Sequence, residues 1–268
     1  MDKHNTKLEL SVVYIVKNGG YLLEKSLASV FRWVDDIVLI DNGSTDNTLA
    51  IAHNYHARTF HELAHHDEGK LRELALAEAR YPWILVLDHD EVVTAELQTE
   101  IQSLLSSNPA PTAYWIPFRN HLFGRPLRYG GEQYRKLVLF HTSAIQLINT
   151  AVHARYQARN KKTTKKLNSF IDHYSYQNLF QLITKFTDYG IRLARQRYEK
   201  NEPLSLKKLF MYPLHMFWAR YIKDKGYRDG PLRIVLDGAF AYMEWLSYIG
   251  LLYYLSVHGP HRHHNRHV

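Results

Sequence analysis

The sequence predicts an α/β fold in which a mostly parallel central sheet is flanked by helices, followed by a mixed half and a helical C-terminal region. Three observations predict it. Apolar runs typical of buried strands alternate with amphipathic helical runs through the first 108 residues. Polar loops rich in Asp, Asn, Gly and Ser follow the strand-like runs. A chain of 268 residues that is 46% hydrophobic is large enough to bury a sizeable core.

The alternating elements can be placed in order along the chain. The expected strands cover residues 8–16, 36–40, 57–60 and the apolar run that ends at Asp88. The expected helices cover an amphipathic run with Leu22, Leu23, Leu27 and Val30 on one face, then residues 48–55 and 68–79. Ser44 or Thr45 is the natural N-cap of the second helix. Because each strand is followed by a helix, the strands are expected to run parallel.

The pattern of apolar and polar residues changes after Pro109. Short strand-like runs broken by Gly and Pro follow at 114–118, 122–129 and 137–140, and they predict mixed or antiparallel structure. From Tyr176 the pattern is helical, with an apolar face formed by Leu179, Leu182, Ile183, Phe186 and Leu193. The predicted organisation is a domain at 1–175, divided into halves at 1–108 and 109–175, a helical region at 176–258 and a disordered tail at 259–268.

Composition narrows the classes of function. The chain has no cysteine, which excludes disulfides and cysteine-based zinc sites and is compatible with a reducing compartment. The polar N-terminus lacks the apolar core of a signal peptide. A net charge of +8 favours anionic partners such as phosphorylated substrates, an acidic membrane surface or nucleic acid. An acid-free basic run at 155–166 is either a solvated loop or a site for phosphates, with the residues Arg155, Arg159, Lys161, Lys162, Lys165 and Lys166.

The last long apolar segment, residues 234–257, is long enough to span a bilayer. Asp237 and Glu244 interrupt it, and each carboxylate would be costly in hydrocarbon. A transmembrane helix is therefore the less favoured interpretation. The tyrosines and Trp245 of this segment, with basic residues upstream, are typical either of a packed core or of a helix in a membrane interface.

The strand that ends at Asp88 leads into the sequence DHDE at 88–91. In an extended chain, residues i and i+2 point the same way, so Asp88 and Asp90 are expected to address one site while His89 faces elsewhere. Two carboxylates suit a hard divalent cation whose other ligands are waters and phosphate oxygens. The alternative is a strand end followed by an acidic helix N-terminus, capped by Asp90 or Thr94.

The order and spacing of several motifs resemble family 2 glycosyltransferases of the GT-A fold, and more closely the KdtX/WaaE-like lipopolysaccharide-core glucosyltransferases. The resemblance covers nearly the whole chain. The specific segments are DNGSTD at 41–46 and DHDE at 88–91. The others are LSVVYIVKN at 10–18, GRPLRYGG at 124–131, RKLVLF at 135–140, VH at 152–153, HYSY at 173–176 and KGYRDG at 225–230.

The resemblance implies a nucleotide-sugar site. The residues expected to line the nucleotide are Ile15, Val16, Lys17 and Asn18. Asp41 is expected to contact the base, because a carboxylate can accept the uracil imide proton; the alternative is a turn-forming Asp. Arg72, and with less support Lys70, match a basic residue that contacts phosphate or orders a loop; the alternative is a solvated helix face.

The resemblance also implies metal and catalytic residues. Asp88 is expected to contact the ribose or the metal, and Asp90 to coordinate Mg²⁺ or Mn²⁺ bound to the diphosphate. An inverting enzyme needs a base, and Glu91, Glu132 and His153 are the candidates. Glu132 is otherwise a loop acid and His153 a packed histidine. The chain departs from its relatives at Ala154, where many carry Glu after the histidine, and at Gly19-Gly20, where an acid is usual.

The resulting hypothesis is an inverting glycosyltransferase that uses UDP-glucose and a divalent cation. The expected acceptor is a lipopolysaccharide-core or other lipid-linked cell-envelope saccharide, and the expected location is the cytoplasmic membrane face, on an anionic lipid surface. The alternative is a non-catalytic saccharide- or membrane-binding protein that keeps the fold. Nucleic acid is not expected as a partner, because the net positive charge is the only feature of the sequence that favours nucleic-acid binding.

Overall fold

The computed structural model describes residues 7–63, 67–149 and 154–259. These residues form two compact units. One, the sheet unit, comprises residues up to Asn120 together with Tyr134–Ser175; the other, the helical unit, comprises His121–Gln133 together with the residues from Tyr176 onward. The segment 121–133, which the sequence places in the half at 109–175, is therefore grouped with the helical region.

The sheet unit is built on four parallel strands, as the alternating pattern predicts. They are β1 (Leu8–Val16), β2 (Val34–Asp41), β3 (Arg58–His61) and β4 (Trp83–Leu87). Their order in the sheet is β3-β2-β1-β4, and the pairs β1–β2, β2–β3 and β1–β4 are all parallel. The apolar side chains of β1 and β4 lie in the core, which explains their near-continuous hydrophobic sequence.

The sheet continues beyond β4 with mixed strand directions, as expected for the second half. The further strands, in their order in the sheet, are β8 (Gln133–His141), β6 (Ala113–Leu122), β12 (Ile171–Tyr176) and β5 (Glu91–Val93). β8 is antiparallel to β4, and β5 is antiparallel to β12. The run DHDE thus lies between two strands of the same sheet, which fixes both of its ends.

Four helices belong to the sheet unit: α1 (Gly20–Ala28), α2 (Thr48–Asn54), α3 (Glu68–Ala77) and α4 (Ala95–Ser106). The face predicted for α1 is correct, since Leu22, Leu23 and Leu27 are buried, and Val30 is buried just beyond the helix. The predicted cap of α2 is wrong. Asn47 occupies the cap position, and the carboxylate of Asp46, rather than the hydroxyl of Ser44 or Thr45, accepts the hydrogen bond from the backbone of Thr48.

Local sequence signals mislead in two further places. The run 122–129 forms only the two-residue strand β7 (Arg125–Pro126), because Phe123 and Gly124 take positive φ and turn the chain sharply. The basic run is not one loop. It contributes β10 (Ala154–Ala158), which pairs with β9 (Ile145–Asn149), a short 3-10 helix (Lys161–Thr163), and β11 (Lys165–Lys166), which pairs with β6.

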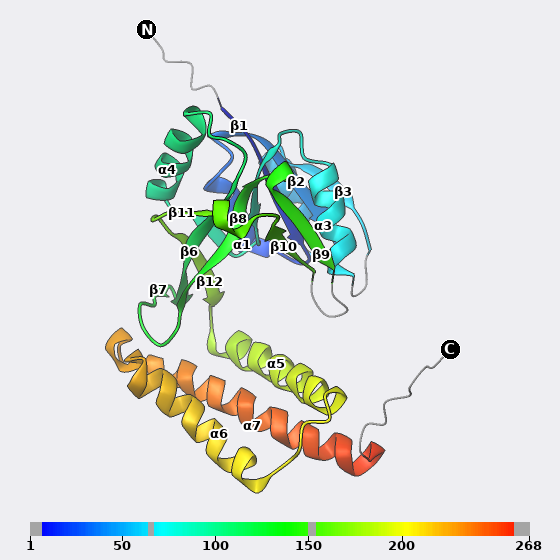
Figure 1. Cartoon of the computed structure of the whole chain (residues 1–268), viewed down its shortest axis with the longest axis vertical. Coiled ribbons are helices and arrows are strands. Elements are labelled where there is room, and N and C mark those ends of the chain that lie inside the picture. The colour runs from blue at the N-terminus through cyan, green and yellow to red at the C-terminus, as the bar shows by residue number, and fades with distance from the viewer. Residues whose placement is uncertain (1–6, 64–66, 150–153, 260–268) are drawn as a thin grey trace. The chain divides into compact units, whose positions relative to one another are not determined.

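The helical unit contains three long helices that lie side by side in Figure 1: α5 (Leu179–Glu199), α6 (Leu206–Trp218) and α7 (Arg233–His258). α7 packs against both α5 and α6. The face predicted for α5 is only partly correct. Leu182 and Phe186 are buried, whereas Leu179 and Ile183 are exposed; the buried row continues through the small residues Gly190 and Ala194. A Cβ at Gly190 would lie 3.1 Å from the backbone oxygen of Met243, so close helix packing selects this row.

Within the part of the chain that the structure describes, no helix has the length and apolar character needed to cross a membrane. α7 contains the apolar segment that raised the question. Its two acids lie inside the unit, where Asp237 pairs with Arg233 at 2.9 Å and Glu244 with Arg197 at 2.8 Å.

Candidate active site

Three loops follow the carboxyl ends of β1, β2 and β4, which are parallel neighbours and therefore end at one edge of the sheet. A Cβ built on Gly19 shows how closely they approach. It would lie 2.9 Å from Val16 Cγ1, 3.0 Å from Leu23 Cβ and 3.3 Å from His89 Cβ. This crowding gives a physical reason for glycine at position 19, whereas Gly20 has a positive φ that favours glycine.

The first two loops are joined by hydrogen bonds. Asn18, which has a positive φ, donates from its backbone to Ser44 Oγ at 2.9 Å, and its side-chain oxygen accepts from the Thr45 backbone at 2.8 Å. The Gly19 backbone donates to Thr48 Oγ1 at 2.8 Å. Val16 is buried at the end of β1, whereas Lys17 is exposed. The structure therefore holds the predicted nucleotide loop in one defined conformation.

Asp41 lies at the end of β2 and is buried. Its carboxylate accepts from the Ser44 backbone at 3.0 Å, and His61 Nδ1 lies 2.9 Å from Oδ2. Burial alone would raise the pKa of Asp41, but the hydrogen bonds from Ser44, His61 and Gly43 outweigh it and lower the pKa. Asp41 is thus ionised at neutral pH. The bond to Ser44 is the one that the turn-forming alternative predicts, and the contact to a base stays a prediction.

Asp88 and Asp90 follow β4, but they do not lie in an extended chain. Residues 88–91 form a turn in which the Glu91 backbone donates to the Asp88 carbonyl at 3.1 Å, so the alternation argument was wrong. The Asp88 side chain is exposed and lies 3.8 Å from Lys136 Nζ. Asp90 is largely buried, and its Oδ2 lies 3.3 Å from His173 Nε2. The alternative cap is half correct, since Thr94 caps α4 by accepting from the Leu97 backbone.

Glu91 lies beneath this turn, and both of its carboxylate oxygens are engaged. Oε1 accepts from Lys136 Nζ at 2.7 Å, and Oε2 accepts from the Asp88 backbone at 3.0 Å. Burial, together with the nearby Asp88 charge, raises the pKa of Glu91 to about 7, although Lys136 and His173 oppose the shift. Glu91 therefore connects β8 to the turn that carries Asp88.

Lys136 is the cation of this cluster, and no local sequence pattern predicts its role. Its ammonium lies 4.6 Å from the Phe118 ring centroid and 5.8 Å from that of Tyr134. Burial would lower the pKa of Lys136, but the charges of Glu91 and Asp88 outweigh it and raise the pKa further above its ordinary value. A positive charge is thus fixed next to the two carboxylates at every physiological pH.

His173 belongs to the HYSY motif, and its contacts define its place in the site. Tyr134 Oη lies 2.9 Å from His173 Nδ1, while His173 Nε2 faces Asp90. The three residues come from β8, β12 and the loop between β4 and β5, which all belong to one sheet. An imidazole oriented in this way by a second hydrogen bond is typical of a residue that holds a neighbouring carboxylate or ligand in place.

Lys70 and Arg72 lie on α3. Lys70 is exposed and pairs with Glu62 at 2.7 Å, which raises the pKa of the lysine. The Arg72 guanidinium lies 5.3 Å from the ring centroid of Tyr156 on β10. The structure thus places Arg72 against another element, whereas Lys70 lies at the surface.

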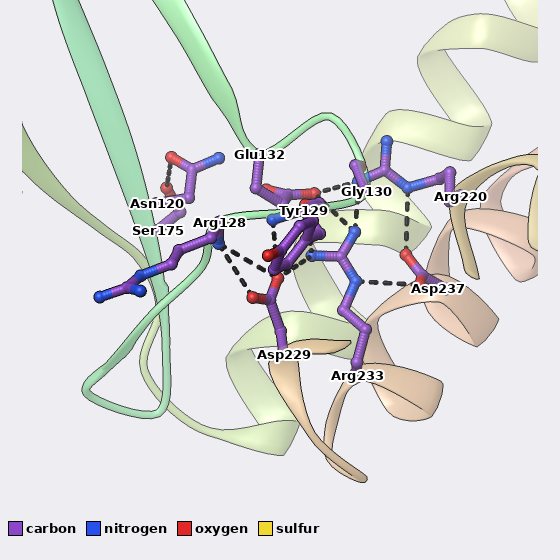
Figure 2. Close-up of polar contacts among 10 residues, drawn as sticks. All are labelled: Asn120, Arg128, Tyr129, Gly130, Glu132, Ser175, Arg220, Asp229, Arg233 and Asp237. Carbon is purple, nitrogen blue, oxygen red and sulfur yellow. Dashed lines mark hydrogen bonds and ion pairs between the residues drawn. The ribbon is translucent and has the colours of Figure 1, made fainter. Parts of the chain in front are cut away.

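Glu132 and His153 are the remaining two candidates, and neither belongs to the described part of the sheet unit. Glu132 belongs to the helical unit, where its buried carboxylate accepts from Arg220 and lies 3.5 Å from Arg233 (Figure 2). Arg233 in turn donates to Asp237 at 2.9 Å and to the Gly130 carbonyl at 3.0 Å. His153 lies outside the described residues.

The donor atoms at the sheet edge suit a hard cation that shares its ligands with a bound diphosphate. In the described part of the chain, no three His, Asp or Glu side chains converge into a cluster able to hold a metal. Asp88 and Asp90 supply carboxylate oxygens, and Mg²⁺ normally takes only one or two carboxylates from a protein together with waters and substrate phosphates. The residues present therefore fit the expected ion when a nucleotide brings the rest.

Comparison with known proteins gives relatives along most of the chain. An uncharacterized glycosyltransferase of Rickettsia felis is 27% identical over 254 residues, with 89% of this chain and 87% of that protein covered. The lipopolysaccharide core biosynthesis glycosyltransferase LpsC of Rhizobium meliloti is 29% identical over 123 residues, which cover 44% and 45%. A TPR repeat-containing protein of Synechococcus elongatus is 39% identical over 102 residues, and the match spans only 25% of its length.

Among solved structures, S. aureus TarS matches 92% of this chain and 55% of its own, with a TM-score of 0.47 and 13% identity. The sequence profile described as Glycosyl transferase family 2 matches residues 11–198, which include most of β1, the DNGSTD loop, the DHDE turn and His173. The predicted GT-A class of α/β fold, with its largely parallel sheet, is thereby confirmed. The chain belongs to glycosyl transferase family 2.

Proposed function

We propose that this protein is an inverting, metal-dependent hexosyltransferase that transfers glucose from UDP-glucose to a lipopolysaccharide-core or other cell-envelope saccharide. The observation that carries the proposal is the common sheet edge formed by the loops after β1, β2 and β4, with Asp41, Asp88 and Asp90 on it. Similarity to LpsC supports an acceptor of the lipopolysaccharide type.

Asp90 and Asp88 are the residues that would hold Mg²⁺ or Mn²⁺. When bound, the ion supplies positive charge that stabilises the departing nucleoside diphosphate. The chain contributes a second positive charge through Lys136, whose ammonium lies 3.8 Å from Asp88. His173 holds Asp90 from the other side, so the two acids are oriented before the donor arrives.

The nucleotide is held by the two joined loops. The Asn18 and Ser44 bond fixes the loop that carries Val16 and Lys17. Ionised Asp41 can accept the imide proton of uracil, which gives a preference for a uridine nucleotide. Arg72 and Lys70 provide positive charge on α3 for the diphosphate.

Three residues are candidates for the base that takes the proton of the acceptor hydroxyl: Glu91, Glu132 and His153. The pKa of about 7 suits Glu91 for proton exchange near neutral pH. Because both of its oxygens are already bonded, we assign Glu91 a positioning role, in which it holds the Asp88 backbone and Lys136. Glu132 and His153 stay predictions.

We further propose that the enzyme acts at the cytoplasmic face of the membrane, on a lipid-linked acceptor. The exposed basic side chains between Arg155 and Lys166 supply charge for acceptor phosphates. These residues belong to the sheet unit, as do the carboxylates of the donor site.

The test is a donor assay with purified protein. UDP release from UDP-glucose and transfer to a heptose-containing core saccharide are measured with Mn²⁺, with Mg²⁺ and with EDTA. We expect metal-dependent turnover that Asp90→Asn abolishes and Glu24→Gln, an exposed acid on α1, leaves intact. Metal-dependent binding of UDP-glucose without turnover would favour the non-catalytic alternative. The absence of both binding and turnover would refute the proposed donor site.

A further inference from the structure

Large apolar side chains occur at every fourth position along α6 and the π-helical turn that continues it (Ala219–Lys223), and all of them face solvent. They are Leu206, Phe210, Leu214, Trp218 and Ile222, which are 76%, 58%, 64%, 50% and 48% exposed. Residues four apart are neighbours on the surface of a helix, so these five form a continuous row along it. We call it the α6 row.

The α6 row is not the core face of the helix. Leu209 and Pro213 are the buried residues of α6, and Leu209 belongs to an apolar cluster with Tyr248 and Leu251 of α7. The packing of α6 in its own unit is therefore provided by side chains other than those of the row. A surface helix normally presents polar side chains there, and a contiguous apolar face marks an interaction site.

Charge indicates the partner. From 203 to 223 the sequence contains no Asp or Glu, but it contains Lys207, Lys208, Arg220 and Lys223. Lys208 and Arg220 are used inside the unit, by Glu202 at 2.8 Å and by Asp237 at 3.2 Å. Lys207 and Lys223 are exposed near the two ends of the α6 row. Exposed apolar and aromatic residues flanked by lysines are typical of a helix that lies in the surface of an anionic bilayer.

We infer that the α6 row is a docking surface for an anionic lipid membrane, with α6 parallel to the bilayer plane and the apolar row in the interface. This inference rests on the proposed membrane location and gives it a defined surface. The inference also assigns membrane contact to a different segment from the one that the sequence indicated. The sequence singled out residues 234–257, but α7 packs against both other helices and uses its acids in buried ion pairs, whereas α6 carries the unpartnered row.

The test measures flotation of the purified full chain with two kinds of vesicle. One consists of phosphatidylcholine alone, and the other also contains about 30 mol% phosphatidylglycerol. We expect retention on the anionic vesicles and weaker retention on the neutral ones. The double variant Phe210→Glu/Leu214→Glu places two charges on the row and should reduce the bound fraction about tenfold or more. The control Leu49→Glu alters an exposed leucine of α2 in the sheet unit and should bind as wild type.

A second pair of variants tests the charge contribution. Lys207→Gln/Lys223→Gln should weaken retention on anionic vesicles and leave the remaining binding to neutral vesicles unchanged. Circular dichroism of each variant establishes that the helices are intact. Loss of binding by the row variant without loss of helix content supports the inference.

The inference fails if wild-type protein does not float with anionic vesicles, or if the row variant floats as well as wild type. It also fails if wild type sediments as a dimer, the row variant sediments as a monomer and neither binds vesicles, because the row would then join two copies. UDP release from UDP-glucose in solution is measured on the same samples. If it persists in the row variant, the donor site stands whatever the lipid result; if it is absent in wild type, the proposed function fails separately.

Discussion

The two units place charged and apolar side chains in opposite ways. The sheet unit buries its apolar strands and carries Asp88 on an exposed turn at the sheet edge. The helical unit buries Arg233 with Asp237 and exposes large apolar side chains along α5, α6 and α7. In the described part of the sheet unit, the exposed large apolar side chains are few: Tyr21, Leu49, Leu63 and Trp115. Charged side chains therefore lie at the sheet edge that we propose as the donor site in one unit, whereas they form buried ion pairs between helices and loops in the other.

The largest expected effect is on the carboxylates of the sheet unit. Asp90→Asn removes a charge at the proposed metal site but keeps the size of the side chain, so we expect turnover to fall about 100- to 1,000-fold. Unfolding by denaturant should change much less than turnover, because asparagine keeps the side-chain size and an oxygen that can face His173 Nε2. Steady-state UDP release measures the effect, with Glu24→Gln as control. If Asp90→Asn turned over as fast as wild type, Asp90 would have no role in the proposed metal site.

The next effect belongs to the helical unit. Arg233→Met leaves the buried carboxylates of Asp237 and Glu132 without one of their partners, which should cost about 3–5 kcal/mol of unfolding free energy. Arg228→Met, in the same unit but at an exposed arginine, is the matched control and should be close to wild type. Denaturant titration followed by circular dichroism measures both. Equal stability of the two variants would contradict a structural role for the buried charges.

Glycine substitutions test the same network through the backbone. A Cβ at Gly130 would lie within van der Waals overlap of the Arg233 guanidinium, whereas a Cβ at Gly124 meets nothing within 4 Å; both residues have positive φ. Gly124→Ala should therefore cost about 1 kcal/mol from backbone strain alone. Gly130→Ala should cost about 1–3 kcal/mol more, because Arg233 must move. Thermal unfolding compares the two, and equal losses would show that Arg233 shifts without penalty.

A pH profile examines the buried acid of the sheet unit. The pKa of Glu91 is raised to about 7 by burial and by Asp88, so the proton binds as pH falls through 7 and the pair with Lys136 is lost. We expect kcat/KM to fall about tenfold per pH unit below that value. Glu91→Gln should be less active at pH 8 and should lack this acid limb. An unchanged limb in Glu91→Gln would assign it to another group.

The smallest effect is expected at the surface of the helical unit. Arg195 and Glu199 pair at 2.8 Å on α5, but both side chains are exposed. Arg195→Ala should therefore change the unfolding free energy by no more than about 0.5 kcal/mol. Arg197→Ala, two residues away, removes the buried partner of Glu244 and should cost several times more. Similar losses of unfolding free energy in the two variants would contradict the view that buried ion pairs contribute more to stability than exposed ones.

The features that the sequence determined are those that depend on neighbours along the chain. The alternation of strand and helix placed β1, β2 and β4 to within a few residues, because burial on both faces leaves a continuous apolar run. The parallel direction then followed, and with it the common edge that carries Asp41, Asp88 and Asp90. The apolar face of α1 was equally readable, since a helix that covers a sheet shows a regular period.

The features that only the tertiary structure decided are those that join distant segments. Lys136, His173 and Tyr134 reach the Asp88–Glu91 turn because β8 and β12 lie in the same sheet, and no local pattern encodes that order. Glu132 reads as a loop acid, yet Arg220 and Arg233, about 90 or more residues later in the chain, surround it. The buried row of α5 was set by close packing at Gly190 rather than by the largest hydrophobic residues. Local physics fixed the elements and the ends of the strands, whereas long-range packing fixed which charges meet.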